Sequence, residues 1–318
     1  MLVTGGAGFI GSHIVELLVK KRIPVVVIDN FSRGQANNLH HIRKKFVLYE
    51  LDITSSKLIS IMEKEKPTHV IHHAAQASVQ ASIHSPLFDA KANIIGTLNV
   101  LEACRQVGVH KIIFASSAAV YGRQEGSLTE QCPTLPSSPY GLSKLTGEQY
   151  VKLYKEKFGL DYAILRYANV YGPRQSLQGE GGVVSIFINR LLCGEQVSIF
   201  GDGTQTRDFV FVEDVAKANL LALVADGSVV ANISTNTAIS ICDLYKKLVD
   251  IIGFNSKLVY EPFRTGDLKS SQLANEKAKQ YLGWQPRFMI GQGLVKTITY
   301  YEKKLARIIN KEQIDASL

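Results

Sequence analysis

Short apolar runs alternate with amphipathic stretches over the first two thirds of the chain, and this alternation limits the folds open to it. Four runs are short, rich in β-branched residues and apolar throughout, as in strands buried on both faces: residues 24–29 (PVVVID), 69–73 (HVIHH), 111–115 (KIIFA) and 162–166 (YAILR). Helical patterns lie between them, at residues 12–20, 93–107 and 141–158. This order predicts an α/β fold built on a doubly wound parallel sheet with right-handed crossovers.

The rhythm changes after about residue 171. A glycine-rich break (GPRQSLQGEGG) is followed by short strands at 198–203, 208–214 and 231–234 and by helices at 241–252 and 291–309. A chain of 318 residues has room for two domains. We expect a first domain of residues 1–170, to which 206–236 return, and a smaller interleaved α/β domain of residues 171–205 and 237–318. From about Asn310 onward we expect a frayed tail.

Composition narrows the class of protein. Hydrophobic residues make up 46% and charged residues 20%, which is typical of a folded globular chain. No apolar run is long enough to cross a membrane, and no secretory signal is visible. The net charge of +8 is spread in modest clusters, which argues against nucleic acid and fits an anionic small molecule. Four scattered cysteines without a CxxC pair suggest reduced thiols, no metal site and a cytoplasmic protein.

A glycine-rich turn follows the first strand and opens a helix. Gly5, Gly8 and Gly11 have the spacing that gives a tight turn, close approach of a pyrophosphate and close helix packing. The amides at the start of the helix can then bind phosphate. Asp29 ends the next strand, eighteen residues after Gly11, where a carboxylate can hold a ribose. Its charge would repel a 2′-phosphate, so the pattern favours NAD over NADP, although Arg33 argues the other way.

Asp52 and Ile53 follow a further strand and could cover an adenine. The alternative for Asp52 is a helix N-cap, and the sequence does not decide between the two.

Tyr140 and Lys144 are the candidate proton-transfer residues, because their spacing places them side by side on a helix. At i and i+4 of a helix that begins near residue 139, both side chains emerge on one face. A phenol is a poor base at neutral pH, but a nearby ammonium and an oxidised nicotinamide ring both favour the phenolate. Ser116 and Ser117 end the strand before this helix. With a dinucleotide site upstream, this combination points to proton transfer coupled to hydride transfer.

Several motifs together resemble the extended short-chain dehydrogenase/reductase superfamily, which implies a Rossmann-type sheet. They are TGGAGFIGSH, HHAA (72–75), SSAAVYG (116–122), SPYGLSK (138–144) and RYANVYGPRQ (166–175). The later segments GDGTQTRDFVFVEDV (201–215) and RTGDLKSSQLANEKAKQYLGW (264–284) resemble its nucleotide-sugar members, and the whole chain is most similar to the UDP-glucose 4-epimerases.

The resemblance implies a catalytic set of Ser117, Tyr140 and Lys144. It implies NAD contacts from Gly5, Gly8, Phe9, Ile10, Gly11, Asp29, Asn30, Asp52, Ile53, Ala74, Ala75, Asn93, Tyr140 and Lys144. It implies substrate contacts from Ser117, Asn169, Val183, Val184, Phe200, Arg207, Arg264, Asp267 and Ser271. For Arg207 the alternative is a structural salt bridge with Asp208 or Glu213, and for Arg166 a structural role is favoured.

Single residue positions distinguish the activities of the related nucleotide-sugar enzymes. The related dehydratases and decarboxylases carry an acidic residue beside the catalytic serine, where this chain has Ala118 and Ala119, which cannot donate a proton. Ser271, or Ser270 after a one-residue slip, resembles the position where a tyrosine excludes N-acetylated hexoses. We therefore expect a UDP-hexose 4-epimerase, with N-acetylated hexoses admitted as well.

The alternative activity is a UDP-uronic acid 4-epimerase, and the alternative of another class is a non-catalytic NAD-binding regulator. By analogy with relatives, helices at 93–107 and 141–158 form a homodimer interface. His72 and His73 are assigned to packing and hydrogen bonding, since no metal-ligand spacing surrounds them.

Overall fold

A parallel sheet organises the first part of the chain in a computed structural model that describes residues 1–176, 182–263 and 268–316, with side chains up to residue 306. The sheet has seven strands within these residues, in the order β11-β7-β5-β4-β1-β2-β3, and each neighbouring pair is parallel. The strands are β1 (Leu2–Thr4), β2 (Val26–Asp29), β3 (Val47–Glu50), β4 (His69–His72), β5 (Lys111–Ser117), β7 (Asp161–Tyr167) and β11 (Val229–Ile233). The predicted doubly wound Rossmann-type sheet is confirmed.

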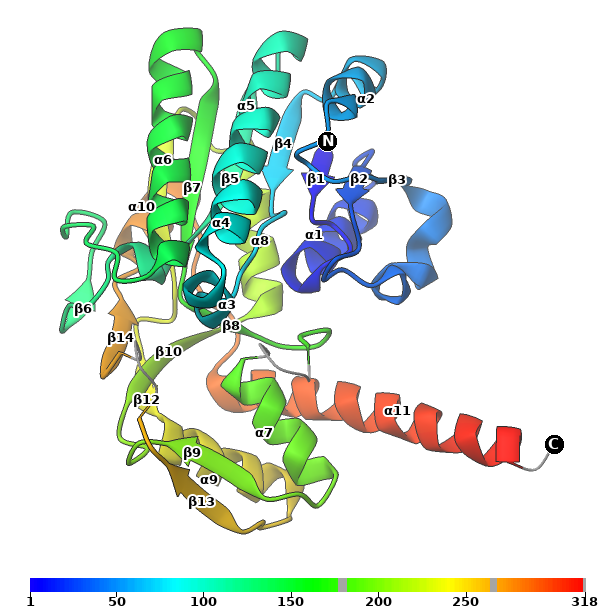
Figure 1. Cartoon of the computed structure of the whole chain (residues 1–318), viewed down its shortest axis with the longest axis vertical. Helices are drawn as coiled ribbons and strands as arrows, with labels where there is room; N and C mark the ends of the chain where they lie inside the picture. Colours follow the sequence, from blue (N-terminus) through cyan, green and yellow to red (C-terminus); the bar gives the residue numbers. More distant parts are fainter. Residues whose placement is uncertain (177–181, 264–267, 317–318) are drawn as a thin grey trace.

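Helices cover both faces of this sheet (Figure 1). One face is covered by α2 (Lys57–Glu65), α5 (Gly96–Val107) and α6 (Pro139–Phe158), and the other by α1 (Phe9–Lys20), α8 (Val212–Val224) and α10 (Glu276–Leu282). Successive strand residues feed opposite cores: Ile112 and Ile164 pack on the first face, Ile113 and Leu165 on the second. Burial on both faces explains why these strands read as continuous apolar runs.

Short helical segments connect these elements. They are the 3₁₀ turns η1 (Ala36–Asn38), η2 (His40–Lys45) and η4 (Ala118–Val120), the helices α3 (Val79–His84) and α4 (Pro86–Ala90), and the π-helical turn η3 (Lys91–Ile95). The helix predicted over 93–107 is therefore α-helical only from Gly96, because its first residues belong to the π turn.

A second lobe lies beyond the carboxyl ends of the parallel strands (Figure 1). Its larger sheet has the order β12-β10-β14-β6, with β8 also paired to β10, and β9 pairs separately with β13. The strands are β6 (Ser127–Leu128), β8 (Asn169–Tyr171), β9 (Val197–Phe200), β10 (Thr206–Phe211), β12 (Ala238–Ser240), β13 (Leu258–Glu261) and β14 (Ser270–Leu273). Helices α7 (Val183–Leu192), α9 (Ile241–Ile252) and α11 (Ile290–Ala316) enclose an apolar core with them.

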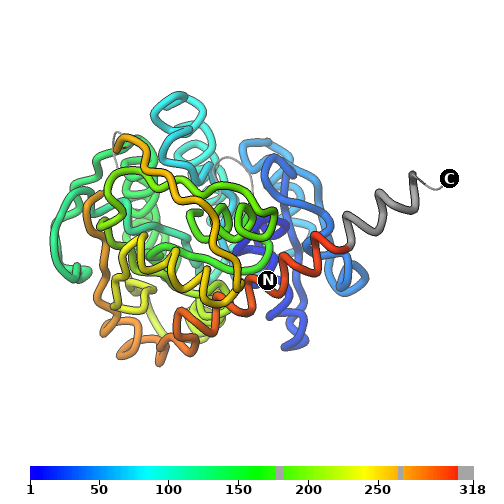
Figure 2. The backbone as a smooth tube through the Cα atoms, turned by 90° about the horizontal axis from the view of Figure 1, so that it is seen from below, coloured from blue at the N-terminus to red at the C-terminus, as the bar shows by residue number. Residues whose placement is uncertain are grey.

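The last helix corrects one expectation. A frayed tail is predicted from Asn310 onward, but α11 continues to Ala316. Figure 2 shows the earlier turns of this helix, in orange and red, running along the underside of the molecule. Leu294, Ile298 and Tyr301 anchor the start of this helix in the core of the second lobe. Once such a turn is fixed by packing, adding further turns is favourable, because each extra residue adds one hydrogen bond.

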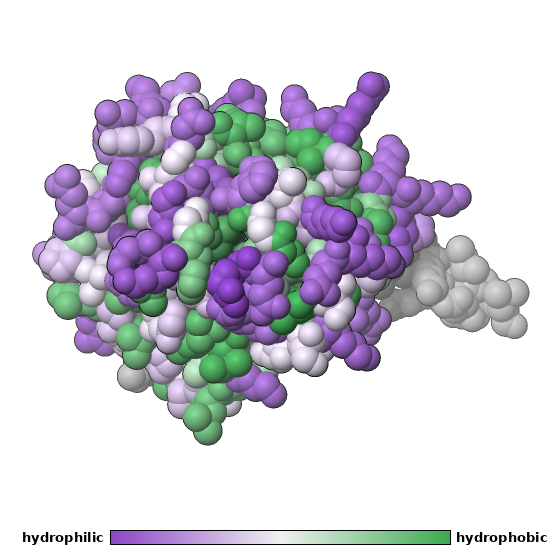
Figure 3. Space-filling model, turned by 90° about the horizontal axis from the view of Figure 1, so that it is seen from above, coloured by the Kyte–Doolittle hydropathy of each residue, from purple (hydrophilic) through white to green (hydrophobic). Residues whose placement is uncertain are grey.

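The segment 206–236 divides between the lobes. Its first strand, β10, belongs to the smaller sheet, whereas α8 and β11 belong to the larger one. Seen from the end away from the second lobe, hydrophilic side chains cover most of the surface, with apolar groups between them (Figure 3). Among the described residues, no helix combines the length and the apolar character that a membrane span requires.

Candidate active site

The candidate residues gather at the carboxyl edge of the parallel sheet. Gly5 follows β1, Asn30 follows β2, Asp52 comes two residues after β3, Ala74 comes two residues after β4, and Ser117 ends β5. In open α/β sheets this edge binds ligands, at the point where the strand order reverses. Here that point lies between β1 and β4.

The glycine-rich turn leaves room for a dinucleotide backbone. Gly5 has φ +66°, and a Cβ on it would lie 2.6 Å from the amide nitrogen of Ala74. A Cβ on Gly11 would lie 2.1 Å from the carbonyl oxygen of Gly5, so only glycine lets α1 start this close to β1. No side chain caps α1 and its first turn carries no acidic residue. The free amides and the positive end of the helix dipole therefore suit a diphosphate.

Asp29 holds the glycine-rich turn in place. Its carboxylate accepts hydrogen bonds from the amides of Ala7 (2.9 Å) and Phe31 (2.8 Å), and the side chain is buried. Burial raises the pKa of this carboxyl above its usual value, while the two amide hydrogen bonds oppose that rise. The carboxylate is thus fixed at the end of β2, beside the turn, as a ribose ligand requires.

Asn30 and Asp52 join the ends of β2 and β3. Asn30 Nδ2 donates to Asp52 Oδ2 (2.7 Å), and Asp52 Oδ1 accepts from the amide and hydroxyl of Thr54 (2.8 and 2.7 Å). The N-cap of α2 is Ser56, so Asp52 forms a turn before the helix and does not cap it. Ile53 is buried against Gly96.

The next loop is held by an amide network. The backbone amide of Ala74 donates to Thr4 Oγ1 (3.2 Å), beside Ala75. Asn93, in the π turn, is buried: its Oδ1 accepts from the amide of Gln76 (2.9 Å), and its Nδ2 lies 3.0 Å from the carbonyl of Gln76 and 3.1 Å from Ser143 Oγ. Asn93 thereby positions the candidate cofactor segment against α6.

Ser117, Tyr140 and Lys144 meet at the end of β5. The hydroxyls of Tyr140 and Ser117 are hydrogen-bonded to each other. Lys144 Nζ donates to the carbonyl of Ala115 (3.0 Å) and lies 6.0 Å from the centre of the Tyr140 ring. Ser138 caps α6 by accepting from the amide of Gly141 (3.1 Å), which fixes the helix start and with it the direction of Tyr140.

Burial dominates the electrostatics of this trio. It raises the pKa of Tyr140 to about 12, against the opposing effect of the Ser117 hydrogen bond. It lowers the pKa of Lys144 to about 8. The i, i+4 spacing predicts that the ammonium favours the phenolate, but in the protein alone burial outweighs such an effect. A positive charge supplied by a ligand is needed to bring the phenol toward ionisation.

The residues assigned to structure behave as expected. His72 lies between the hydroxyls of Thr4 (2.7 Å) and Thr97 (3.0 Å). His73 lies 3.2 Å from Asn219 Oδ1 and stacks on the ring of Tyr167. The structural prediction for these histidines is confirmed.

Arg166 also has the structural role predicted for it. Its guanidinium forms a buried, forked ion pair with Glu148 (2.8 and 2.6 Å), and Glu148 accepts from the hydroxyl of Ser116 (2.6 Å). Together these contacts tie α6 to β5 and β7 beside the candidate trio.

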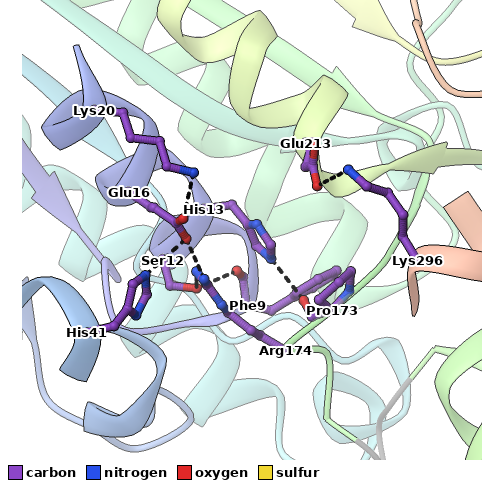
Figure 4. A network of polar contacts seen from close by, with 10 residues as sticks. All are labelled: Phe9, Ser12, His13, Glu16, Lys20, His41, Pro173, Arg174, Glu213 and Lys296. Atoms are coloured by element: carbon purple, nitrogen blue, oxygen red, sulfur yellow. Dashed lines mark hydrogen bonds and ion pairs between the residues drawn. The ribbon is translucent and has the colours of Figure 1, made fainter. Parts of the chain in front are cut away.

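A polar network anchors the outer side of α1 (Figure 4). Glu16 pairs with Lys20 (2.8 Å), His41 (3.5 Å) and Arg174. The hydrogen bonds from Lys20 and Arg174 outweigh burial and lower the pKa of Glu16 to about 2. His13 Nε2 donates to the carbonyl of Pro173 (2.9 Å). The segment after β8 is therefore fastened to α1, whose first turn carries the candidate cofactor residues.

On the substrate side, two candidates are register partners. Arg207 on β10 lies opposite Ser271 on β14, so both side chains leave the same face of the sheet. The carboxylates considered as salt-bridge partners of Arg207 are engaged elsewhere: Asp208 accepts from Thr235 (2.7 and 2.9 Å), and Glu213 pairs with Lys296 (2.7 Å).

The remaining substrate candidates are scattered through the second lobe. Asn169 is exposed, Val183 and Phe200 are partly buried, and Val184 is packed in the core of this lobe. Arg264 and Asp267 lie outside the described residues.

Sequence reasoning missed two buried acids beside the trio, Asp89 and Glu148. The available signal was spacing: Asp89 precedes Asn93 by four residues, and Glu148 follows Lys144 by four.

The opposite edge of the sheet carries a separate cavity. A cavity of about 330 Å³ there is lined by Met1, Ile23, Pro24, Val26, Glu65, Lys66, Pro67 and Thr68, none of which belongs to the candidate site. Within the described residues, no cluster of histidine, cysteine and acidic side chains could hold a metal ion, and the four cysteines are unpaired.

A parallel sheet with a glycine-rich turn and a Ser-Tyr-Lys trio at its carboxyl edge is typical of dinucleotide-dependent enzymes. Comparison with known proteins makes this specific. Residues 1–236 match the model of the NAD dependent epimerase/dehydratase family, and the chain belongs to that family. NAD is its cofactor, and it is an isomerase of the nucleotide-sugar 4-epimerase type.

The relatives support this at full length. The chain is 41% identical over 308 residues to a UDP-glucose 4-epimerase of Mycolicibacterium smegmatis, covering 95% of this chain and 98% of the relative. A crystal structure of the UDP-glucose 4-epimerase of Thermotoga maritima with UDP-glucose has a TM-score of 0.93, with 44% identity and coverage of 96% and 99%. The UDP-N-acetylglucosamine 4-epimerase of Methanobrevibacter ruminantium, in complex with UDP-N-acetylmuramic acid, has a TM-score of 0.91, with 35% identity and coverage of 95% and 98%.

Proposed function

We propose that the protein interconverts UDP-glucose and UDP-galactose, and also UDP-GlcNAc and UDP-GalNAc, by inverting C4 through a transient 4-keto sugar. The observation that carries the proposal is the trio at the end of β5: a Tyr140 hydroxyl bonded to Ser117, with Lys144 one helical turn further along. The glycine-rich cradle beside it fits the diphosphate of NAD. NAD would be held by that cradle, Asp29 and Lys144.

Each residue of the trio has a separate task. Bound NAD supplies a hydride acceptor, and later a hydride donor, at the sugar C4. Tyr140 takes the proton from the C4 hydroxyl and returns it after the keto sugar has rotated within the site to present its other face. Ser117 hydrogen-bonds the same oxygen and fixes its distance from Tyr140. Lys144 places its positive charge near the phenol and the cofactor ribose, which favours the phenolate when the sugar is bound.

The neighbourhood of Ser117 supports epimerisation over dehydration. Ala118 and Ala119 form the 3₁₀ turn directly after it, and the amide of Ala119 donates to Ser117 Oγ (3.2 Å). Protonation of a leaving C6 hydroxyl needs an acid at this place. Neither alanine can supply a proton, so the keto sugar keeps its C6 oxygen and is reduced again.

The pairing of Arg207 with Ser271 supports the assignment of the sugar wall. Arginine suits a diphosphate because its guanidinium offers forked donors. Arg207 on β10 and Ser271 on β14 are register partners, so their side chains lie on the same face of the sheet. Ser270 is the partner of Thr206, and its hydroxyl accepts a hydrogen bond from Thr206 Oγ1 (3.1 Å). We therefore assign the wall to Ser271 and not to Ser270.

Replacing Ser271 by tyrosine tests this wall. We expect Ser271→Tyr to lower kcat/KM for UDP-GalNAc by about tenfold or more, since a clash that costs about 1.4 kcal/mol in the transition state reduces the rate tenfold. Activity on UDP-galactose should change far less. Ser270→Tyr, on the other face of the strand, is the matched control and should not discriminate between the two sugars. Equal losses for both sugars in Ser271→Tyr would remove Ser271 from the wall.

The activity itself is tested with the purified protein and separate samples of UDP-galactose, UDP-GalNAc and UDP-galacturonic acid, each followed by NMR of the anomeric protons. Conversion of the first two supports the proposal. Conversion of the uronic acid alone assigns the protein to the uronic-acid epimerases. No conversion with NAD added, while NAD still binds, identifies a non-catalytic NAD-binding protein.

The same proposal includes a homodimer. Large apolar side chains remain exposed on neighbouring helices of one face: Leu87 and Phe88 on α4, Ile95 on η3, and Leu142 and Leu153 on α6. Leu87 is 85% exposed, which is unfavourable for a monomer in water. A second copy of the chain on this face would bury them, and light scattering of the purified protein measures the resulting mass.

A further inference from the structure

We propose that Asp89 is a positioning residue of this site: its buried carboxylate holds Gln76 and Asn93 in place and is the counter-charge of the Lys144 ammonium. This inference rests on the catalytic role proposed above for Lys144. It adds a residue, on α4, that the catalytic motifs do not contain.

The hydrogen bonds of Asp89 lead directly to the catalytic helix. Asp89 is 1% exposed, and its Oδ1 accepts from Gln76 Nε2 (2.8 Å) and Asn93 Nδ2 (3.1 Å). The same Asn93 nitrogen lies 3.1 Å from the hydroxyl of Ser143, which precedes Lys144. Two hydrogen bonds therefore separate Asp89 from the residue beside Lys144.

The local backbone is built to allow this contact. Asn93 lies in the π turn of η3, and a π turn changes the direction in which the following side chains point. Asp89, four residues earlier, and Asn93 thereby meet around Gln76. Gln76 is fixed in turn, because its Nε2 also donates to the carbonyl of Ser78 (2.8 Å). The carboxylate closes a network that links the cofactor loop, the π turn and α6.

The charge of Asp89 acts on both catalytic groups. It raises the pKa of Lys144, against the larger lowering caused by burial. It also raises the pKa of Tyr140, adding to the effect of burial. A buried ammonium without a counter-charge readily loses its proton, so Asp89 keeps Lys144 cationic over a wider pH range.

The other groups around Lys144 do not replace this charge. From β5 the carbonyl of Ala115 and the ring of Phe114 face the ammonium. From the end of β4, His72 and His73 are neutral near pH 7, since burial lowers their pKa values to about 3 and 4. Along α6, Glu148 is neutralised by Arg166. Tyr140 faces only Ser117 and Asp89 among the described groups that shift its pKa.

The test uses Asp89→Asn, whose side-chain oxygen can still accept both hydrogen bonds while the charge is lost. In the holoenzyme we expect both limbs of the pH profile of kcat to move to lower pH, because the pKa values of Tyr140 and Lys144 both fall. A shift of one unit lowers kcat about tenfold on the alkaline side. Damage to the structure alone would lower kcat at every pH and leave the limbs in place, and that result would overturn the proposal.

A direct titration makes the test independent of turnover. NMR of ¹³C-labelled lysines, with the Lys144 signal assigned by its loss in Lys144→Met, should show the Lys144 midpoint at lower pH in Asp89→Asn than in wild type. Asp250→Asn, an exposed site on α9 with the same change in net charge, is the control and should leave the midpoint unchanged. An unmoved Lys144 midpoint in Asp89→Asn rejects the proposal. If wild type converts no UDP-sugar, only the proposed function fails.

Discussion

At the scale of residues, the site combines groups whose ordinary pKa values are unsuited to their task. Tyr140 is made less acidic by burial and Lys144 is made less basic by it. In the proposed mechanism the phenol therefore stays protonated until a bound cation and a bound sugar favour proton transfer. Such a site avoids carrying a reactive phenolate when no substrate is present.

Removing the phenol hydroxyl tests its role as base. We expect Tyr140→Phe to lower kcat for UDP-galactose by about 10²–10⁴-fold, the usual contribution of a positioned acid–base group. The ring still fills its place and the other cofactor contacts remain, so the variant should still hold NAD, measured by chromatography after denaturation. A variant that keeps more than a tenth of the wild-type kcat would contradict the assignment.

The candidate site residues could be predicted from the sequence, but most of their hydrogen-bond and ion-pair partners could not. Spacing predicts Tyr140 and Lys144, whereas the strand end predicts Ser116 or Ser117 and the family resemblance implies Ser117. Asp89 and Glu148 were not predicted, because their partners come from other elements: Gln76 follows β4, and Arg166 lies on β7. A buried charge in a single sequence looks the same as an exposed one until the fold brings its partner to it.

At the scale of elements, the glycine-rich turn and α1 work as one unit. The turn and the helix can pack this closely because Gly11 has no side chain, and a Cβ at this position would collide with the carbonyl oxygen of Gly5. The helix is then held from its outer side by the ion pairs of Glu16.

A single methyl group should disturb this unit. We expect Gly11→Ala to weaken NAD binding by at least about tenfold, because the added Cβ would lie 2.1 Å from the Gly5 oxygen and must push the turn away from α1. Isothermal titration calorimetry, with NAD added to protein from which bound NAD has been removed, measures the affinity. Gly291→Ala, in α11 with open space around its Cβ, is the control and should leave NAD affinity unchanged. An unchanged affinity in Gly11→Ala would mean that the turn can relax without loss of the site.

The elements that the sequence predicts best are those with local signals. The helix predicted over 241–252 coincides with α9, and the strand predicted over 162–166 lies within β7. The π turn at 91–95 was not foreseen, since its side-chain spacing differs little from that of an α-helix. Short strands such as β6 and β14 are defined by each other across the chain, and no local pattern marks them.

At the scale of the whole molecule, buried neutral histidines make the fold sensitive to acid. Burial lowers the pKa of His13 to about 4, of His72 to about 3 and of His73 to about 4. In the unfolded chain the value is about 6.5. The unfolded state therefore binds more protons between these values, so stability is complete above pH 6.5 and falls as the pH drops toward 4.

We expect each of these histidines to remove on the order of 3 kcal/mol from the free energy of unfolding between pH 7 and pH 4. Denaturant unfolding at a series of pH values measures the slope. His72→Asn, which cannot be protonated, should make the slope shallower, whereas replacement of the exposed His84 should not. A slope that His72→Asn leaves unchanged would show that His72 already carries its proton in the folded state.

The interleaving of the two lobes has a consequence for how such a protein can change over time. β6, β8 and β10 belong to the second lobe, yet α8 and β11 return to the first before β12 leaves it again. No single cut in the chain separates the lobe of the seven-stranded sheet from the second lobe. Recombination at one crossover would therefore split both cores, so a change of specificity is easier by point substitution, for example at the proposed wall residue Ser271, within a scaffold inherited whole.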